Sequence, residues 1–249
     1  MQHGIFSDKH PDNLPAEALR HDRRSLMLPD LFTVYGDYWM NVLGDSALGR
    51  LGRIRAVGAP LIARSRALRD RSFVADPGKP VLTLTSQGLA SDQLADFMAR
   101  FLALCPAPLQ LNIRLHPGYE ASDHPYAERF ADDPRVVLWP GNSRPDTYEM
   151  IAMSDLHLSI SSACHYEALG IGTPTGIIAL PSHEIVRNLA DRGDAILIDS
   201  PAALADLIGK RGWSAVPSQT SDYYFRGDHV ASLRGILDEC AELRQRRVQ

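Results

Sequence analysis

Small and polar residues follow four apolar segments of the chain, and their types suit the binding of a phosphate group. They are Thr85-Ser86-Gln87-Gly88 after VLTLT, Arg114 and His116-Pro117-Gly118 in and after LQLNIRL, Pro140-Gly141-Asn142 after VVLW, and Ser161-Ser162 after DLHLSI. Hydroxyl, amide and imidazole groups donate hydrogen bonds to phosphate oxygens, and the charge of an imidazole responds to a nearby anion. The set therefore has the chemistry to hold an anionic ligand.

These residues meet only if the apolar segments before them are parallel strands of one sheet, because ligands bind beyond the carboxyl ends of such strands. The sequence predicts strands at 81–85, 109–115, 136–139, 155–160, 175–180 and 195–198. Helical periodicity lies between them, most clearly over 91–104. Short apolar strands that alternate with helices predict an α/β fold with a doubly wound, Rossmann-like parallel sheet.

Residues before several of the helices have the types found at helix N-termini. Ser91 is expected to cap the helix over 91–104, and Asp146 with Glu149 has the spacing of a capping box. Ser182 is expected to cap a helix that ends near Gly193, and Ser200-Pro201 should open another helix.

Each candidate residue of the phosphate site also has a plainer interpretation. Ser161 and Ser162, with the amides after them, form a helix N-terminus that favours an anion, or they only cap that helix. His116 donates to phosphate, or belongs to a structural loop. Glu167, about one turn into the helix, accepts from a ribose diol, or faces solvent. Ser86 and Gln87 contact phosphate or cap a helix, and His157 is expected to be a satisfied core residue.

The remainder of the chain suggests a division into three parts. Residues 1–78 carry two short strand candidates, LFTVYG and RIRAVG. Seven arginines lie between Arg50 and Arg71, and they indicate either a solvated linker or helix face, or a surface that binds an acidic acceptor or lipid head groups. Residues 79–215 form the predicted nucleotide-binding domain. Residues 216–249 form a helical tail whose apolar stripe should pack on the protein, namely Val230, Leu233, Ile236, Leu237, Cys240 and Leu243.

Composition excludes several classes of protein. The 249 residues are 45% hydrophobic with a net charge of −4, so the average charge points to neither nucleic acid nor an anionic membrane. Three separated cysteines predict reduced core residues rather than disulfides or a metal site, and no apolar run would span a bilayer. We expect a cytoplasmic protein, which could also associate peripherally with the inner face of the membrane.

The segments IRLHPGY and WPGNSRPDTYEMIAMSDLHLSISSACHYEALGIGTPTGII resemble the nucleotide-binding, C-terminal half of a GT-B glycosyltransferase. Within that fold they are most similar to the CDP-glycerol glycerophosphotransferases, bacterial polysialyltransferases and related capsule-polymer transferases. The matching features are Arg114-Leu115-His116-Pro117, the serines from Ser159 to Ser162, Glu167 and Gly172-Thr173-Pro174. The resemblance covers roughly residues 30–210.

This resemblance implies a transferase for surface-polysaccharide synthesis that uses a CMP-, CDP- or UDP-linked donor, with no metal or other cofactor. The donor would be a nucleotide sugar or CDP-glycerol-like, the acceptor a glycan or lipid-linked chain, and nucleic acid is no partner. His116 and His3 would be the catalytic residues, His3 because Gln2-His3-Gly4 resembles a loop of the family's first domain. The donor would bind at Ser86, Gln87, Arg114, His116, Asn142, Ser161, Ser162 and Glu167.

The sequence also departs from the family. The acidic motif that polysialyltransferases carry in the first domain has no counterpart, which suggests that most of that domain is missing from this chain or supplied by a partner subunit. The aromatic residue that usually precedes His-Gly in glycerophosphotransferases is Gln2 here. Two alternatives stay open: an enzyme like UDP-GlcNAc 2-epimerase, and a non-catalytic nucleotide-sugar-binding subunit.

Overall fold

The computed structural model of the protein describes residues 28–88, 90–120 and 125–248. They group into two compact units, one made of residues up to Arg64 together with Ser218–Gln249, and the other of Ser65–Pro217. The sequence had suggested 1–78, 79–215 and 216–249, and that division stays a prediction about domains. The contacts join the C-terminal segment to the N-terminal one.

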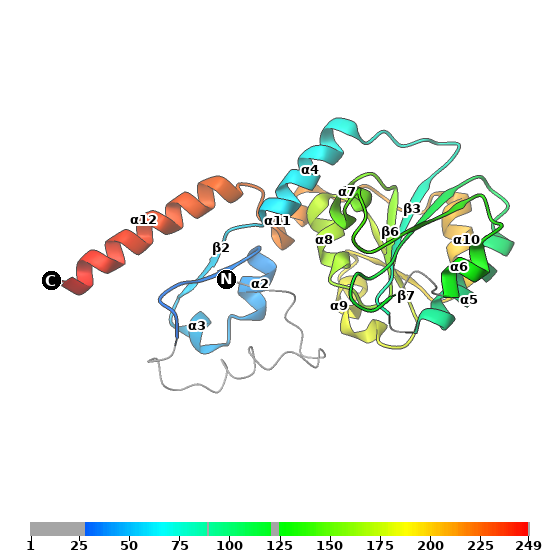
Figure 1. Cartoon of the computed structure of the whole chain (residues 1–249). Coiled ribbons are helices and arrows are strands. Elements are labelled where there is room, and N and C mark those ends of the chain that lie inside the picture. The colour runs from blue at the N-terminus through cyan, green and yellow to red at the C-terminus, as the bar shows by residue number, and fades with distance from the viewer. Residues whose placement is uncertain (1–27, 89, 121–124, 249) are drawn as a thin grey trace. The chain divides into compact units, whose positions relative to one another are not determined.

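The larger unit is built on a six-stranded parallel sheet with the order β5-β4-β3-β6-β7-β8. Figure 1 labels its strands β3, β6 and β7. Its strands are β3 (Val81–Thr85), β4 (Gln110–Arg114), β5 (Val136–Trp139), β6 (Leu156–Ser159), β7 (Thr175–Ile178) and β8 (Ile196–Ile198). All six predicted strands are confirmed, within two residues at each end. Counted within this sheet, the order is 3-2-1-4-5-6, which is that of a Rossmann fold.

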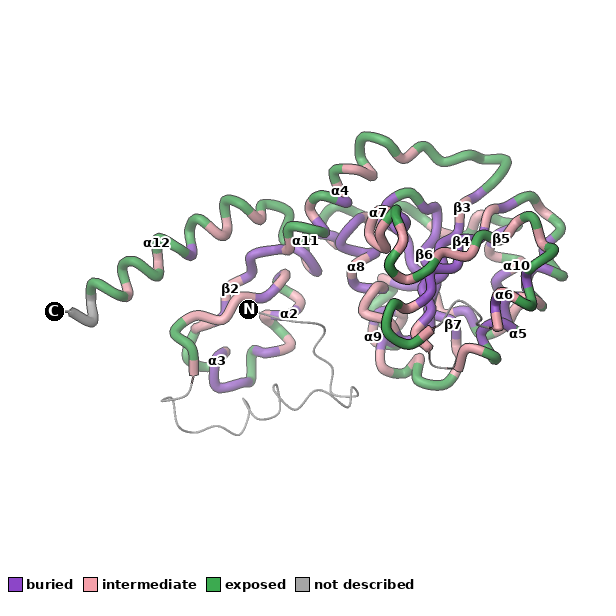
Figure 2. Tube along the Cα trace, viewed as in Figure 1, coloured by how far each residue is buried: buried purple, intermediate pink, exposed green. Residues whose placement is uncertain are grey.

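Helices cover both faces of the sheet. Helix α5 (Ser91–Leu104) packs on both α6 (Pro125–Phe130) and α10 (Pro201–Lys210), while α7 (Thr147–Ala152) packs on α8 (Cys164–Ile171). The chain between β7 and β8 forms the 3-10 turn η2 (His183–Ile185) and α9 (Arg187–Asp191). The strands β3, β4, β6 and β7 are buried between these layers, whereas the edge strands β5 and β8 are less so (Figure 2). Apolar strands are expected where helices cover both faces.

The helix caps agree with the sequence in two cases and differ in two. The side chain of Asp146 accepts from Glu149 N–H in a complete capping box, and Ser200 Oγ accepts from Ala203 N–H. Ala90, not Ser91, is the N-cap of α5, so the hydroxyl of Ser91 is directed elsewhere. Ser182 adopts a left-handed conformation and makes no side-chain cap.

Four of the seven arginines before the sheet lie in one helix, α4 (Pro60–Ser72), in agreement with the helix face that was one of the sequence alternatives. Arg66 Nε donates to Gly170 O near the end of α8, at 2.8 Å. Arg69 donates to Ala152 O and Ser154 O at the end of α7, at 2.9 and 2.8 Å. Cations near helix C-termini satisfy unpaired carbonyls and the helix dipole, so both side chains have a structural role.

The smaller unit pairs β1 (Phe32–Val34) with β2 (Ile54–Ala56) in parallel, with helices α2 (Asp37–Val42) and α3 (Ala47–Arg50) between them. Helices α11 (Ser218–Tyr224) and α12 (His229–Val248) complete it. The indole of Trp39, which is fully buried, donates to Tyr224 O at 3.0 Å, and Tyr35 stacks on Phe225. Through these aromatic contacts the C-terminal segment around α11 packs on α2 of the N-terminal segment.

Three of the six residues of the stripe predicted to pack along α12 are exposed, and Leu233 and Leu243 are partly buried. Ile236 is buried, but Val230 and Leu237 expose 61% and 62% of their surfaces. An ion pair between Arg55 and Glu239, at 2.6 Å, connects β2 to this helix. Cys240 is likewise exposed, so of the three free cysteines only Cys105 is fully buried as expected.

Replacing Trp39 by Phe should destabilise the smaller unit. The buried Tyr224 carbonyl loses its donor and the ring leaves space, so the free energy of unfolding should fall by about 2–3 kcal/mol. Urea unfolding followed by circular dichroism measures this. Trp213→Phe, at a partly exposed indole, is the control and should cost less than about 1 kcal/mol. Equal losses in the two variants would contradict the role of the Trp39 hydrogen bond.

Candidate functional site

Strands β3 and β6 are neighbours at the centre of the sheet, and the chain continues from them toward opposite edges. Loops after such strands diverge and leave a crevice at their carboxyl ends. Here the two loops meet through one side chain, because Gln87 Oε1 accepts from Ser161 N–H at 2.9 Å and from Ser161 Oγ at 3.4 Å. Ser86, Gln87 and Ser161 are thereby brought together at the carboxyl ends of the strands, as the sequence predicted for parallel strands of one sheet.

His116 lies at the same edge, after β4. Its backbone N–H donates to Ser86 Oγ at 3.2 Å, which links it to the loop after β3. Its Nδ1 accepts from Gly118 N–H at 3.1 Å, and its ring stacks on Tyr119. A neutral imidazole whose Nδ1 accepts carries its proton on Nε2, so the hydrogen bond fixes the tautomer that has a donor on the other side of the ring.

Two glycines allow the three loops after β3, β4 and β5 to touch. A Cβ at Gly88, which has a φ of +69°, would lie 2.5 Å from Tyr119 Cβ. A Cβ at Gly141 would overlap the backbone of Pro117. The loop that carries His116 is therefore held between its two neighbours, and Asn142 lies exposed beside Gly141.

Glu120 is a member of this edge that the sequence analysis missed. Its carboxylate accepts from the Ser86 hydroxyl, from Ser91 Oγ at 3.1 Å and from His116 N–H at 2.7 Å. The nearby buried phenol of Tyr126 has a raised pKa, mainly because of burial and further because of the Glu120 charge. The only signal in the sequence is a Glu four residues after His116, in a loop where no periodicity indicates its direction.

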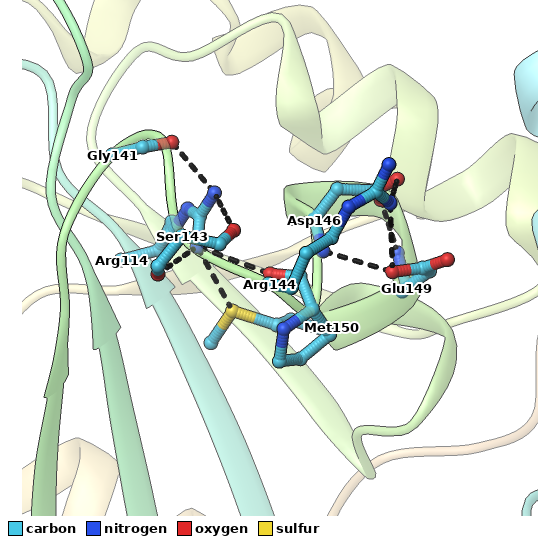
Figure 3. A network of polar contacts seen from close by, with 8 residues as sticks. Arg114, Gly141, Ser143, Arg144, Asp146, Glu149 and Met150 are labelled. Carbon is cyan, nitrogen blue, oxygen red and sulfur yellow. Dashed lines mark hydrogen bonds and ion pairs between the residues drawn. The ribbon is translucent and has the colours of Figure 1, made fainter.

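Arg114, expected to bind the donor, lies in a different setting (Figure 3). Its guanidinium donates to Gly141 O at 2.6 Å, to Ser143 O at 3.0 Å and to Pro145 O at 3.1 Å. It is 4% exposed, and burial lowers its pKa. The side chain thus holds the loop between β5 and α7, and its Nε is the one nitrogen there without a hydrogen-bond partner among the described residues.

Glu167 and Ser162 form a second group at the start of α8. Ser162 Oγ accepts from Cys164 N–H at 3.1 Å, but the N-cap of α8 is Ala163, which makes no side-chain cap. The Tyr148 hydroxyl donates to Glu167 Oε1 at 3.1 Å. Burial raises the pKa of Glu167, while hydrogen bonds from Cys164 and Tyr148 oppose this shift. The carboxylate is therefore held by its neighbours rather than turned freely into solvent.

A buried polar chain supports the central strands from beneath the edge. Thr175 Oγ1 lies 2.8 Å from His157 Nδ1 and 2.7 Å from His165 Nδ1, and His157 Nε2 lies 2.9 Å from Thr85 Oγ1. Both imidazoles are fully buried, as the sequence predicted for His157. Burial lowers the pKa of His157, and lowers the pKa of His165 to about 3. The chain joins β3, β6, β7 and α8.

His3 lies outside the described residues, so its expected place in the site stays a prediction. Within the described part of the chain, no group of three or more His, Cys, Asp and Glu side chains is arranged to hold a metal ion. In the same part, no helix is both long and apolar enough to cross a membrane.

Comparison with known proteins places this architecture. No protein-family model matches the chain, and no curated protein matches it in sequence. Among solved structures it is similar to the wall teichoic acid polymerase TagF with CDPG, with a TM-score of 0.53 and 11% identity over 100% of this chain. It is similar to the calicheamicin glycosyltransferase CalG4, with a TM-score of 0.54 and 13% identity over 87% of this chain. A protein described as a UDP-N-acetylglucosamine 2-epimerase, from Listeria monocytogenes, gives a TM-score of 0.52 and 12% identity over 86%.

The chain spans 64% of the length of that TagF structure, 53% of CalG4 and 68% of the epimerase-like protein. At these identities the similarity defines the fold. The chain has the α/β architecture of the C-terminal half of a GT-B fold.

The buried histidines should make the stability of the protein depend on pH. Their folded-state pKa values lie below the ordinary 6.5, so below that pH the unfolded chain binds protons that the folded chain does not. The contribution of the neutral histidines to stability should therefore be fully present above pH 6.5. The free energy of unfolding should fall as the pH drops to 5, by up to ~1.4 kcal/mol per pH unit for each histidine.

Urea unfolding at several pH values between 7.5 and 5 measures this slope. His157→Gln should reduce the slope relative to the unaltered protein. A slope that is the same in both proteins would contradict the assignment.

Arg114→Lys should lower the free energy of unfolding by about 2 kcal/mol, because an ammonium cannot reproduce the forked contacts to three carbonyls. Arg144→Lys, on the surface of the same loop, should change it by less than about 0.5 kcal/mol. Thermal and urea unfolding measure both. Unchanged stability with a loss of nucleotide binding in Arg114→Lys would instead assign Arg114 to the ligand.

Proposed function

We propose that this protein binds a nucleotide-activated donor at the carboxyl edge of β3, β4 and β6 and takes part in a glycosyl- or glycerophosphate-transfer reaction. The observation that carries the proposal is the meeting of Ser86, Gln87, His116 and Ser161 at the point where the strand order reverses. Open parallel sheets bind ligands at this point. The GT-B architecture supports the same kind of activity.

The residues at this edge suit the stabilisation of a phosphate leaving group. His116 has its Nδ1 engaged, which leaves Nε2–H as the donor toward an oxyanion. Ser161 and Ser162 precede α8, whose N-terminal amides and dipole favour negative charge. Donors fixed before the reaction stabilise charge that develops in the transition state. These groups would lower the barrier to departure of the nucleotide.

Glu167 is the residue we assign to the ribose. A carboxylate accepts from both hydroxyls of a diol, and the contacts from Tyr148 and Cys164 hold this one in place. Asn142 and the neighbouring backbone would contact the base, and Arg114 would act by holding that loop. His3 would act near the reacting centre.

The donor we propose is CMP-, CDP- or UDP-linked, a nucleotide sugar or a CDP-glycerol-like compound, and the acceptor a glycan or lipid-linked chain of the cell surface. The similarity to a wall teichoic acid polymerase with CDPG supports this choice. A cytoplasmic position, or one at the inner membrane face, follows from such substrates. Acceptor binding would fall largely on a first domain or a partner subunit.

The similarity to the epimerase-like protein keeps a second candidate, since that structure matches about as well as TagF. A transferase releases nucleotide from the donor only when an acceptor is present, whereas an epimerase changes UDP-GlcNAc without one. A non-catalytic subunit would bind the nucleotide and do neither. Analysis of products from UDP-GlcNAc, CDP-glycerol and CMP-linked sugars, with and without acceptor, separates these three functions.

Binding is tested by thermal unfolding with CMP, CDP and UDP. Ligand at about a hundred times its dissociation constant should add ~2.7 kcal/mol to the free energy of unfolding and raise the melting temperature. His116→Ala should remove the shift, and His183→Ala should keep it. No shift with any pyrimidine nucleotide at millimolar concentration would reject the proposed site.

A further inference from the structure

The donors at the edge of the sheet are not vacant, because side-chain oxygens of the chain itself accept from them. Gln87 Oε1 lies on Ser161 N–H, and the Glu120 carboxylate lies on the hydroxyls of Ser86 and Ser91 and on His116 N–H. Of these two acceptors only Glu120 carries a charge. Three hydrogen-bond donors from three segments thus converge on one anionic group.

We propose that Glu120 is an internal competitor of the donor phosphate, and that its carboxylate, which Ser91 also holds, must leave Ser86 Oγ and His116 N–H before a phosphate can occupy that position. This inference rests on the proposed function, since it concerns regulation of the same site. A carboxylate and a phosphate are both oxyanions that accept from hydroxyl and amide donors. Each hydroxyl has a single proton, so the two anions cannot share the same set.

Electrostatics supports exchange rather than joint occupation. Two anions within a few ångströms repel each other, most strongly where water is partly excluded. Ser86 is 4% exposed, so its hydroxyl is in such a place. Glu120 also lies close to Ser91, the first residue of α5, where the 14-residue helix adds a favourable field for negative charge.

The local backbone explains how the carboxylate reaches this position and how it could leave. The N–H groups of Tyr119 and Glu120 both donate to His116 O, at 3.4 and 3.3 Å, so the chain turns back on itself. The Glu120 side chain then reaches the amide of His116, four residues earlier. Rotation about the side-chain bonds of Glu120 takes the carboxylate away from all three donors, while Ser86 Oγ keeps Arg114 O as an acceptor and His116 N–H keeps Ser86 Oγ.

The proposal is tested by calorimetric titration of the full chain with CDP, UDP and inorganic pyrophosphate. Glu120→Gln keeps the shape but removes the charge, and should tighten binding about tenfold, which corresponds to 1.4 kcal/mol. Ser91→Ala removes a donor that holds Glu120, and should tighten binding about fivefold, since such a hydrogen bond has a net worth near 1 kcal/mol. Glu128→Gln removes an exposed carboxylate on α6 and should leave the affinity within about twofold, as expected for a distant surface charge.

The outcomes separate the inference from the proposed function. Tighter binding in Glu120→Gln and Ser91→Ala but not in Glu128→Gln supports it. If the unaltered protein binds the ligands and Glu120→Gln and Ser91→Ala bind them equally well or more weakly, only the competitor role is overturned. Glu120 is then a fixed part of the loop. Absence of binding by every protein to all three ligands rejects the site itself. Thermal unfolding without ligand identifies any variant that fails to fold.

Discussion

The contact between Gln87 and Ser161 spans the place where the sheet changes direction, and the geometry of the site depends on it. Strands β3 and β6 lie side by side, but their following helices pack on opposite faces, so their loops would otherwise diverge. The amide of Gln87 closes that gap through Ser161 N–H. His116 then joins the same group through Ser86. A small set of hydrogen bonds thereby joins the carboxyl ends of three strands, β3, β4 and β6, into one continuous surface of donors.

Below this surface, hydrogen bonds between buried polar side chains fix the register of the strands. The hydroxyl of Thr175 lies between the Nδ1 atoms of His157 and His165, and Thr85 meets the other nitrogen of His157. A hydroxyl can donate to one imidazole and accept from the other, so the two rings have different tautomers. Arg114 has a comparable part in the next loop, where one guanidinium satisfies three carbonyls. Partial slippage would leave several buried groups unpaired, which favours a single register.

Hydrogen-bond donors gather at the carboxyl end of the sheet, and side-chain oxygens of the chain itself accept from them. Helix N-termini, loop amides and serine hydroxyls all point to one side of a parallel sheet, which is a favourable place for a nucleotide phosphate. Gln87 and Glu120 accept hydrogen bonds from these donors. Internal acceptors of this kind stabilise the fold, and under the proposed function their displacement is a cost that a ligand must overcome.

The sequence by itself determined the six strands, the long helix α5, the capping box at Asp146 and the edge on which the polar residues gather. Those features follow from local periodicity and from the parallel connection rule, which act over short stretches of chain. Only the tertiary structure decided that Arg114 holds a loop, that Ser91 serves Glu120 rather than its helix, and that the C-terminal segment joins the N-terminal unit through Trp39. These outcomes depend on which distant groups come within 3 Å of each other, and periodicity carries no information about that. The direction of a loop side chain is set by its neighbours in space, and here those neighbours come from other strands.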